Sequence, residues 1–257
     1  MIPFAMLLAS STVGRWPLNL PLYGCIILAV VTLIVAFLLF FVATCLWEKQ
    51  HLSGDIEPAQ QPFPYTPQPY WIKTRDEAAR LGLWFGGDFA TRKTASVVRG
   101  LETFFFTPDH LTLVSIVAAS TAGAKLKKTI LRTRLDDGRI VESTDNPVTR
   151  DVTRVIECRV LMNAGLEELL SFHLQRLRHA CSVPVPFNPS AALAESERIQ
   201  LERGQRLVAA GLARWLNPQQ TCLRLNLRGA LAYLKDLFVQ MGQLEDQRMR
   251  VDIKRAG

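Results

Sequence analysis

The longest uncharged run of the chain lies near its amino terminus, where no charged residue occurs between Arg15 and Glu48. An α-helix over the apolar part of this run spans about 37 Å at roughly 1.5 Å per residue. The hydrocarbon core of a bilayer is about 30 Å thick, so such a helix is long enough to cross it. The run therefore predicts a transmembrane helix over residues 18–47, embedded in a lipid bilayer and preceded by a short tail over residues 1–17.

Two other interpretations of this run are weaker. A cleavable signal sequence has an apolar region of roughly 7–15 residues before a small-residue cleavage site, and the present run is longer. A buried helix of this length would normally carry some polar side chains, whereas from Tyr23 to Trp47 the only side chains more polar than Cys or Tyr are Thr32 and Thr44. Aromatic residues suited to the headgroup zone of a bilayer stand at the margins of the run: Trp16, Tyr23 and Trp47.

The flanking charges and the cysteines bear on which side of the membrane holds the bulk of the chain. Arg15 lies on one flank and Lys49 on the other, where Glu48 opposes it, so the positive charges are nearly balanced. Of the five cysteines, two belong to the apolar run. The remaining three cysteines are an odd and sparse set, which is not typical of the disulfide framework of a secreted protein. We therefore expect the bulk of the chain on the cytoplasmic side.

A proline-rich linker is predicted over residues 48–71. Five prolines from Pro58 to Pro69 remove backbone donors and favour an extended, polyproline-like path. We expect a semi-rigid stalk that holds a folded domain off the bilayer. The alternative is a docking ligand for an aromatic groove on another protein, because Pro64 to Pro67 has the PxxP form.

The next residues predict an α+β domain over residues 72–182. Thr74 is suited to cap a short helix that ends near Gly82. Gly87 to Thr94 differs from the phosphate-loop pattern G-x-x-x-x-G-K-[ST] only at Arg92, where the second glycine is needed. A side chain there obstructs the curl of the backbone around a phosphate. This stretch is therefore expected to be a solvated basic loop, and the LGLWF run before it is a poor candidate for a buried strand.

From Leu101 to Thr144 the pattern is that of β-strands. Four strand-like runs are separated by turn residues, and Asp137-Gly138 supplies the positive φ angles of a tight hairpin turn. We expect a four-stranded antiparallel meander packed with helices, with one face in solvent. On an edge strand, basic residues protect against aggregation, but they also suit an anionic surface. The third strand carries five basic residues that form a candidate patch for binding an anionic surface: Lys125, Lys127, Lys128, Arg132 and Arg134.

An amphipathic helix is predicted from Gly165 to Cys181, because leucines recur at helical spacing with charged residues between them. His173 falls on the apolar stripe, which predicts a packed, hydrogen-bonded histidine. A metal site formed with His179 and Cys181 is not expected. Two histidine ligands on one helical face usually stand four residues apart, and no CxxC or acidic partner accompanies them.

Residues 183–257 are expected to form a C-terminal region with a long helix, a short β-hairpin and a second helix. The order from Gln205 to Leu237 looks like the back half of a winged-helix domain. The stretch from Ser190 to Leu212, however, is expected to be one continuous helix. A separate recognition helix, which would enter a DNA groove, therefore has no candidate.

The composition and motifs favour a binding function over a catalytic one. The net charge is +7, but the basic residues are spread over the sheet and the C-terminal helices rather than gathered on a recognition helix. No hydrolase elbow, zinc-protease or dinucleotide-binding motif occurs, so no catalytic residue, cofactor or metal is predicted. The sequence favours a membrane-anchored, non-catalytic interaction module with an unidentified protein partner. The alternatives are a membrane-tethered DNA-binding regulator and a membrane-bound enzyme without a recognisable motif.

Overall fold

The computed structural model describes residues 20–47, 49–52, 56–63, 66–91, 99–121, 124–146, 152, 156–236 and 238. The chain forms two compact units, Met1–Cys45 and Leu46–Gly257. The first contains nearly all of an apolar helix, and the second combines strands and helices, so the predicted α+β class is confirmed. We refer to Leu46–Gly257 as the α+β unit.

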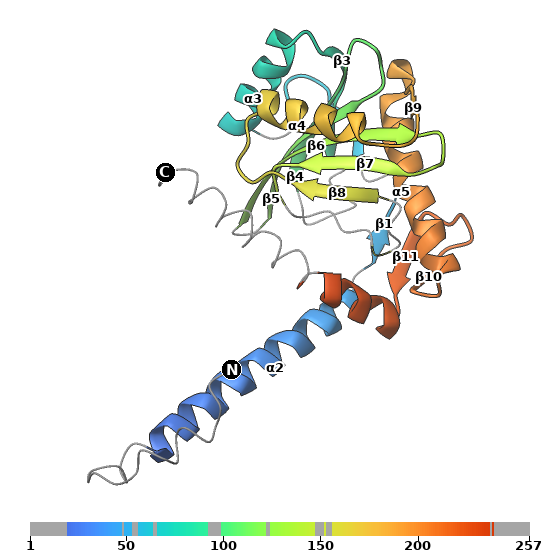
Figure 1. Ribbon diagram of the computed structural model, residues 1–257. Coiled ribbons are helices and arrows are strands. Elements are labelled where there is room, and N and C mark those ends of the chain that lie inside the picture. Colours follow the sequence, from blue (N-terminus) through green and yellow to red (C-terminus); the bar gives the residue numbers. More distant parts are fainter. Residues whose placement is uncertain are drawn as a thin grey trace. The chain divides into compact units, whose positions relative to one another are not determined.

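Helix α2 (Leu20–Trp47), blue in Figure 1, carries no charged residue. Its large apolar side chains are exposed, as at Phe40, which is 71% accessible. The Thr32 hydroxyl donates to the Leu28 carbonyl at 2.8 Å, and that of Thr44 donates to the Phe40 carbonyl at 2.8 Å, so neither leaves an unpaired polar group on the helix surface. The helix is long and apolar enough to cross a membrane, a property that signal sequences share.

An eight-stranded sheet forms the centre of the α+β unit, with the strand order β2-β3-β4-β5-β6-β7-β8 and with β9 paired to β6. Neighbouring strands are antiparallel except β7 and β8, which are parallel. The predicted four-stranded meander corresponds to β4 through β7 and is confirmed. The strands are β2 (Ile56–Pro58), β3 (Trp84–Thr91), β4 (Arg99–Phe106), β5 (Leu113–Thr121), β6 (Ala124–Leu135), β7 (Ile140–Thr144), β8 (Ile156–Val160) and β9 (Pro184–Val185).

The hairpin between β6 and β7 closes in the predicted tight turn. The Gly138 amide donates to the Leu135 carbonyl at 3.0 Å, and the Leu135 amide donates to the Arg139 carbonyl at 2.8 Å. Gly138 has a φ of +80°, the left-handed region that residues with a Cβ rarely adopt. Among the described turn residues it alone has a positive φ, whereas the sequence suggested this for both residues of the Asp-Gly pair.

Two helices, α3 (Pro69–Arg80) and α4 (Leu166–Arg178), lie on the same face of the sheet (Figure 1). Trp71 and Leu169 pack from these helices onto sheet residues such as Phe105, and all three side chains are buried. This core covers one face of the sheet. Helix α4 matches the amphipathic helix expected from the sequence.

The opposite face of the sheet packs against helix α5 (Ala192–Ala209), which follows a 3-10 turn, η1 (Pro189–Ala191). Ile199 of α5 is buried with Phe104 and Leu113 of the sheet. The sheet is therefore covered on both faces, not on one as predicted.

A second, three-stranded sheet has the order β1-β11-β10. Strands β10 (Ala213–Trp215) and β11 (Cys222–Leu225) form the hairpin predicted after the long helix, and residues 227–236 form the helix predicted after the hairpin. The third strand, β1 (Gln50–His51), comes from the proline-rich segment and pairs antiparallel with β11.

The prediction of a solvated loop before β4 is wrong, because β3 occupies residues 84–91. Two glycines hide the strand pattern: pairing with β4 shifts in register between Phe85 and Gly87. A Cβ on Gly86 would lie 2.7 Å from the ring of Phe106, so only glycine lets the aromatic ring cover the backbone there. The phosphate-loop-like stretch is thus a strand over Gly87 to Thr91, and residues 92–98 lie outside the described part.

Helix α3 begins before the predicted cap. Gln68 has extended backbone and Pro69 occupies the first turn, where the missing amide of proline costs nothing. Thr74 is buried within the helix, and its hydroxyl donates to the Tyr70 carbonyl at 2.9 Å.

The proline-rich segment over residues 48–71 is part of the α+β unit and pairs with strands from later in the chain. It contributes β1, which pairs with β11, and β2, which pairs with β3. Gln68 Nε2 donates to the Ala119 carbonyl at 3.1 Å. Over these residues the segment is attached to the folded unit rather than standing clear of it as a spacer.

Candidate functional site

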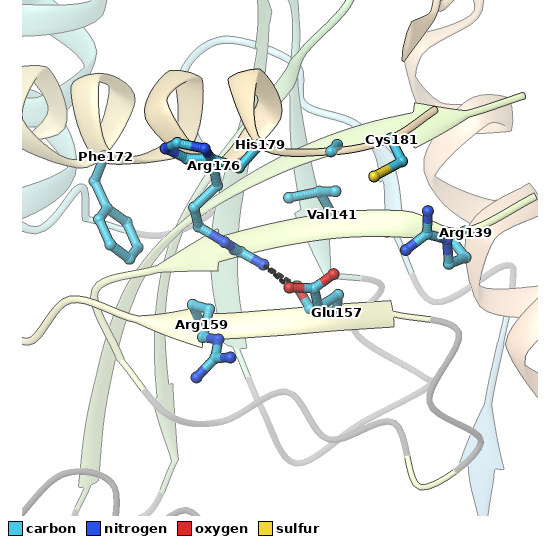
Figure 2. Close-up of a pocket in the computed structure, with 9 residues that line it drawn as sticks. Arg139, Val141, Glu157, Arg159, Phe172, Arg176, His179 and Cys181 are labelled. Atoms are coloured by element: carbon cyan, nitrogen blue, oxygen red, sulfur yellow. Dashed lines mark hydrogen bonds and ion pairs between the residues drawn. The ribbon is translucent and has the colours of Figure 1, made fainter. Parts of the chain in front are cut away.

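An open groove of about 460 Å³ lies between α4 and strand β8 (Figure 2). β8 is the last strand in the sheet order, so the groove follows one edge of the sheet. Figure 2 shows Arg176 extending from α4 to Glu157 on β8, with further arginines contributed by the sheet. The lining residues are Arg139, Val141, Glu157, Arg159, Phe172, Arg176, His179, Ala180 and Cys181.

Local periodicity brings these side chains to one place. Phe172, Arg176 and His179 are spaced by four and three residues, so they share a face of α4. Side chains of a strand alternate between faces, so Glu157 and Arg159 of β8 share one face of the strand, and both line the groove. We call this set of side chains the arginine groove.

Arg176 ties α4 to the two strands beneath it. Its Nη2 donates to the carbonyl of Glu157 at 2.6 Å and lies 3.3 Å from Oε1 of the same residue. Its Nη1 donates to the Ser143 hydroxyl at 2.9 Å and to the carbonyl of Glu142. Burial lowers the pKa of Arg176 and the charge of Glu157 opposes that effect. These four acceptors hold the guanidinium in a fixed position.

Arg139 is held by the turn that precedes β7. Its Nε donates to Asp137 Oδ2 at 2.7 Å and its Nη2 donates to the Ser182 hydroxyl at 3.1 Å. The Ser182 hydroxyl in turn donates to Asp137. Hydrogen bonds from Ser182 and then from the amide of Arg139 lower the pKa of Asp137 to about 2, so this carboxylate is ionised at neutral pH.

Arg159 differs from the other two arginines. It lies exposed on the edge strand, and within the described part of the chain its side chain makes no ion pair or hydrogen bond. Arg139 is paired with Asp137 and Arg176 with Glu157. Among the described residues, the guanidinium of Arg159 is therefore the one in the groove without a charged partner.

A buried polar network supports the groove from the sheet side. His173 is fully buried, with Nε2 3.0 Å from the Thr133 hydroxyl and Nδ1 2.9 Å from the Ser143 hydroxyl. Burial, and then the charge of Arg176, lowers the pKa of His173 to about 3, so the ring is neutral. The packed, hydrogen-bonded histidine predicted from the sequence is confirmed. Because its ring faces the core, it is kept apart from His179 and Cys181, and no cluster of three metal-ligating side chains occurs among the described residues.

The predicted anionic-surface patch is divided between the two faces of β6. Lys125 and Lys127 are exposed on the face of α3, where the Lys127 ammonium lies 5.8 Å from the ring centroid of Tyr70. Arg134, on the other face, lies over the ring of Phe187 and 3.5 Å from Glu195. The strand is central in the meander rather than at an edge.

Two members of that predicted patch, Lys128 and Arg132, are buried. Arg132 Nε donates to Glu142 Oε2 at 2.9 Å across the β6–β7 pair. Burial alone would raise the pKa of Glu142, but the positive charges of Arg132 and Lys128 hold it below its ordinary value. Burial lowers the pKa of Lys128 to about 8. These residues form a charge cluster inside the fold, and the five predicted cations do not meet at one surface.

Of the three predicted membrane-interface aromatics, Trp47 is the one whose side chain the structure describes. Trp47 is the last residue of α2 and is 84% exposed. Trp16 and the side chain of Tyr23 lie outside the described part.

Sequence reasoning missed the three arginines of the groove. Arg139 reads as a turn residue and Arg176 as the polar side of a helix, while Arg159 lies in a short strand, IECRV, that was not predicted. Alternation within IECRV was the only local pattern that could have indicated the strand. Comparisons of the chain with protein families, with characterised proteins and with solved structures found no match.

Proposed function

We propose that this protein is a single-pass membrane protein whose α+β unit is a non-catalytic interaction module, and that the module binds an acidic segment of a partner protein in the arginine groove. The anchor would be α2, which is uncharged and displays apolar side chains on its surface. The bulk of the chain would lie on the cytoplasmic side.

The observation that carries the proposal is the guanidinium of Arg159, which has no ion pair or hydrogen bond among the described residues and lines the groove together with two arginines already held in place. A guanidinium presents a planar fork of donors that matches a carboxylate, and such charge-assisted pairs are stronger than neutral hydrogen bonds. Arg139 and Arg176 need no reorganisation before a ligand arrives, because their own ion pairs fix them. A partner carboxylate would thus meet a pre-formed positive edge, which reduces the entropy lost on binding.

The shape of the groove suits a peptide segment better than an enclosed small molecule. It is open along the sheet edge, and Phe172 supplies apolar surface next to the charges. Arginine and aromatic side chains are the types enriched where protein interfaces gain most of their affinity.

The DNA-binding alternative has less support. The helix before the hairpin, α5, is a single element, and two of its arginines are engaged within the protein. Arg198 Nη2 lies 2.6 Å from Glu195, and Arg203 Nη2 donates to the Tyr233 hydroxyl at 2.6 Å. Acidic side chains alternate with the basic ones along this helix, and the acidic ones would repel the phosphate backbone of DNA.

The test is recovery of partners by affinity-tagged full-length protein solubilised in a mild detergent. Arg159→Glu is expected to lower recovery of the groove-dependent partner at least about tenfold, which corresponds to about 1.4 kcal/mol. Arg80→Glu is the matched control, because Arg80 is an exposed arginine at the end of α3 and does not line the groove. Equal recovery by the Arg159→Glu and Arg80→Glu proteins would contradict the proposal.

A further inference from the structure

The helix at residues 227–236, red in Figure 1, leaves an apolar stripe uncovered. Leu227, Leu231 and Phe238 are 57%, 50% and 55% exposed. At 100° per residue these three positions fall within about 40° of one another, so they share one helical face. Ala230 and Tyr233 point the other way and are buried.

The stripe cannot turn inward, because the other side of the helix is fixed against the hairpin. The Asn226 side chain accepts from the Gly229 amide at 2.9 Å and donates to the Gly211 carbonyl at 2.9 Å. A Cβ on Gly229 would lie 2.0 Å from the carbonyl oxygen of Leu212, so the helix backbone lies directly on that residue. The helix is therefore held with Leu227 and Leu231 facing outward.

A short tether connects this part of the α+β unit to the end of α2. Gln50 pairs with Leu223 of β11, four residues before Leu227. Gln50 follows Trp47 by three residues, which span at most about 11 Å when fully extended. The Leu52 amide also donates to the Thr221 carbonyl at 2.9 Å, so the tether continues into the hairpin without slack. If α2 crosses a bilayer, the hairpin is confined to its surface.

The chemistry of the helix matches a bilayer surface. Leucine and phenylalanine side chains on one face insert into the boundary between headgroups and acyl chains, while basic residues beside them meet anionic headgroups. Arg228 and Lys235 are exposed and lie on one flank of the stripe. We propose that Leu227, Leu231 and Phe238 enter the surface of the bilayer in which α2 is anchored. This second membrane contact rests on the proposed membrane anchoring and would fix the orientation of the α+β unit.

The test places an environment-sensitive fluorophore at single cysteines of the full-length protein reconstituted in vesicles of phosphatidylcholine and phosphatidylserine. Leu231→Cys and Leu227→Cys report on the stripe, and Ile72→Cys is the matched control, because Ile72 is an exposed apolar residue on α3. The native cysteines are replaced by serine in each protein. Lipids that carry a quencher near the headgroup should remove most of the emission at 231 and 227 and little at 72, whereas aqueous iodide should do the reverse.

Two results would overturn the proposal. Iodide quenching at 231 and 227 as strong as at 72 would show that the stripe lies in water, and protection from both quenchers would show that a protein, such as a second copy of the chain, covers it. Carbonate extraction of the same vesicles separates this failure from that of the anchor. A protein that resists extraction with its stripe in water retains the anchor and lacks the second contact, whereas a protein released by carbonate has neither.

Discussion

At the scale of single residues, His173 determines how the stability of the α+β unit responds to acid. In the folded protein its pKa is about 3, because burial and then Arg176 disfavour the charged ring. In an unfolded chain a histidine has a pKa of about 6.5. Between these two pKa values the unfolded state therefore binds one more proton than the folded state. The part of the free energy of unfolding that the neutral ring contributes above pH 6.5 is lost as the pH falls toward 3.

We predict that the free energy of unfolding falls by about 1.4 kcal/mol per pH unit through this site below about pH 6.5. His173→Gln is expected to be less stable than wild type near neutral pH, since it disturbs two buried hydrogen bonds, but to lack this part of the pH dependence. Urea unfolding in detergent at several pH values, followed by tryptophan fluorescence, to which the buried Trp71 contributes, measures both.

His179→Gln provides the control for this series, because it removes a histidine whose side chain is exposed rather than buried. Parallel pH profiles for wild type and His173→Gln would show that the ring does not resist protonation.

At the scale of elements, a buried ion pair joins the strands β6 and β7 in addition to their backbone hydrogen bonds. Arg132 and Glu142 are directly opposed in register, and both are almost fully buried. A buried charge that loses its partner is costly, whereas replacement of the whole pair by apolar residues is often tolerated.

We therefore predict that Arg132→Met lowers the free energy of unfolding by about 3 kcal/mol, because the buried Glu142 carboxylate loses its ion pair and keeps the charge of Lys128 and the hydrogen bond from Cys158. The double change Arg132→Met with Glu142→Leu should recover much of this loss. Arg198→Ala, which removes an exposed ion pair, should cost less than about 1 kcal/mol. Denaturant titration of the four proteins is sufficient, and a double variant less stable than Arg132→Met would contradict the ion-pair argument.

The elements that the sequence predicted are those whose pattern is local. The meander, α4 and the C-terminal hairpin each have regular apolar spacing and a recognisable turn, and their positions follow from a few neighbouring residues. β3 was missed because Gly86 and Gly87 interrupt its alternation at a register shift. α3 was placed too late because a proline at its first turn was interpreted as part of an extended linker.

The groove could not be predicted for a different reason. It exists only because β8 pairs in parallel with β7, and nothing near β8 in the sequence specifies that pairing. Similarly, the alternation within β6 separates Lys127 from Arg132, but the burial of Arg132 depends on Glu142 in the next strand. The pattern of residues along a strand identifies which side chains share a face. Pairing between strands determines whether those side chains are buried and what they contact.

At the scale of the whole molecule, the cysteines offer a direct test of the side on which the α+β unit lies. Cys181 is exposed in the arginine groove, whereas Cys222 is buried. Cys158 donates to Glu142, and burial raises the pKa of its thiol, which makes it a slow nucleophile.

For the proposed cytoplasmic orientation, we predict that a membrane-impermeant maleimide labels the full-length protein at Cys181 only after the cell membrane is opened. Cys181→Ser should abolish this labelling, which identifies the reacting thiol. Labelling at Cys181 in intact cells would place the α+β unit on the outside.

The pairing of β1 with β11 also has a consequence for the time course of biosynthesis. Residue 50 leaves the ribosome long before its partner, residue 223, has been translated. At synthesis rates of about 5–20 residues per second, the interval is roughly 10–35 s. During that time a nascent chain already inserted through α2 would expose a strand edge next to the bilayer, open to other newly made chains. Release of the last strand closes that edge, so a ribosome that stalls before Cys222 leaves a chain that cannot complete the sheet of β1, β11 and β10.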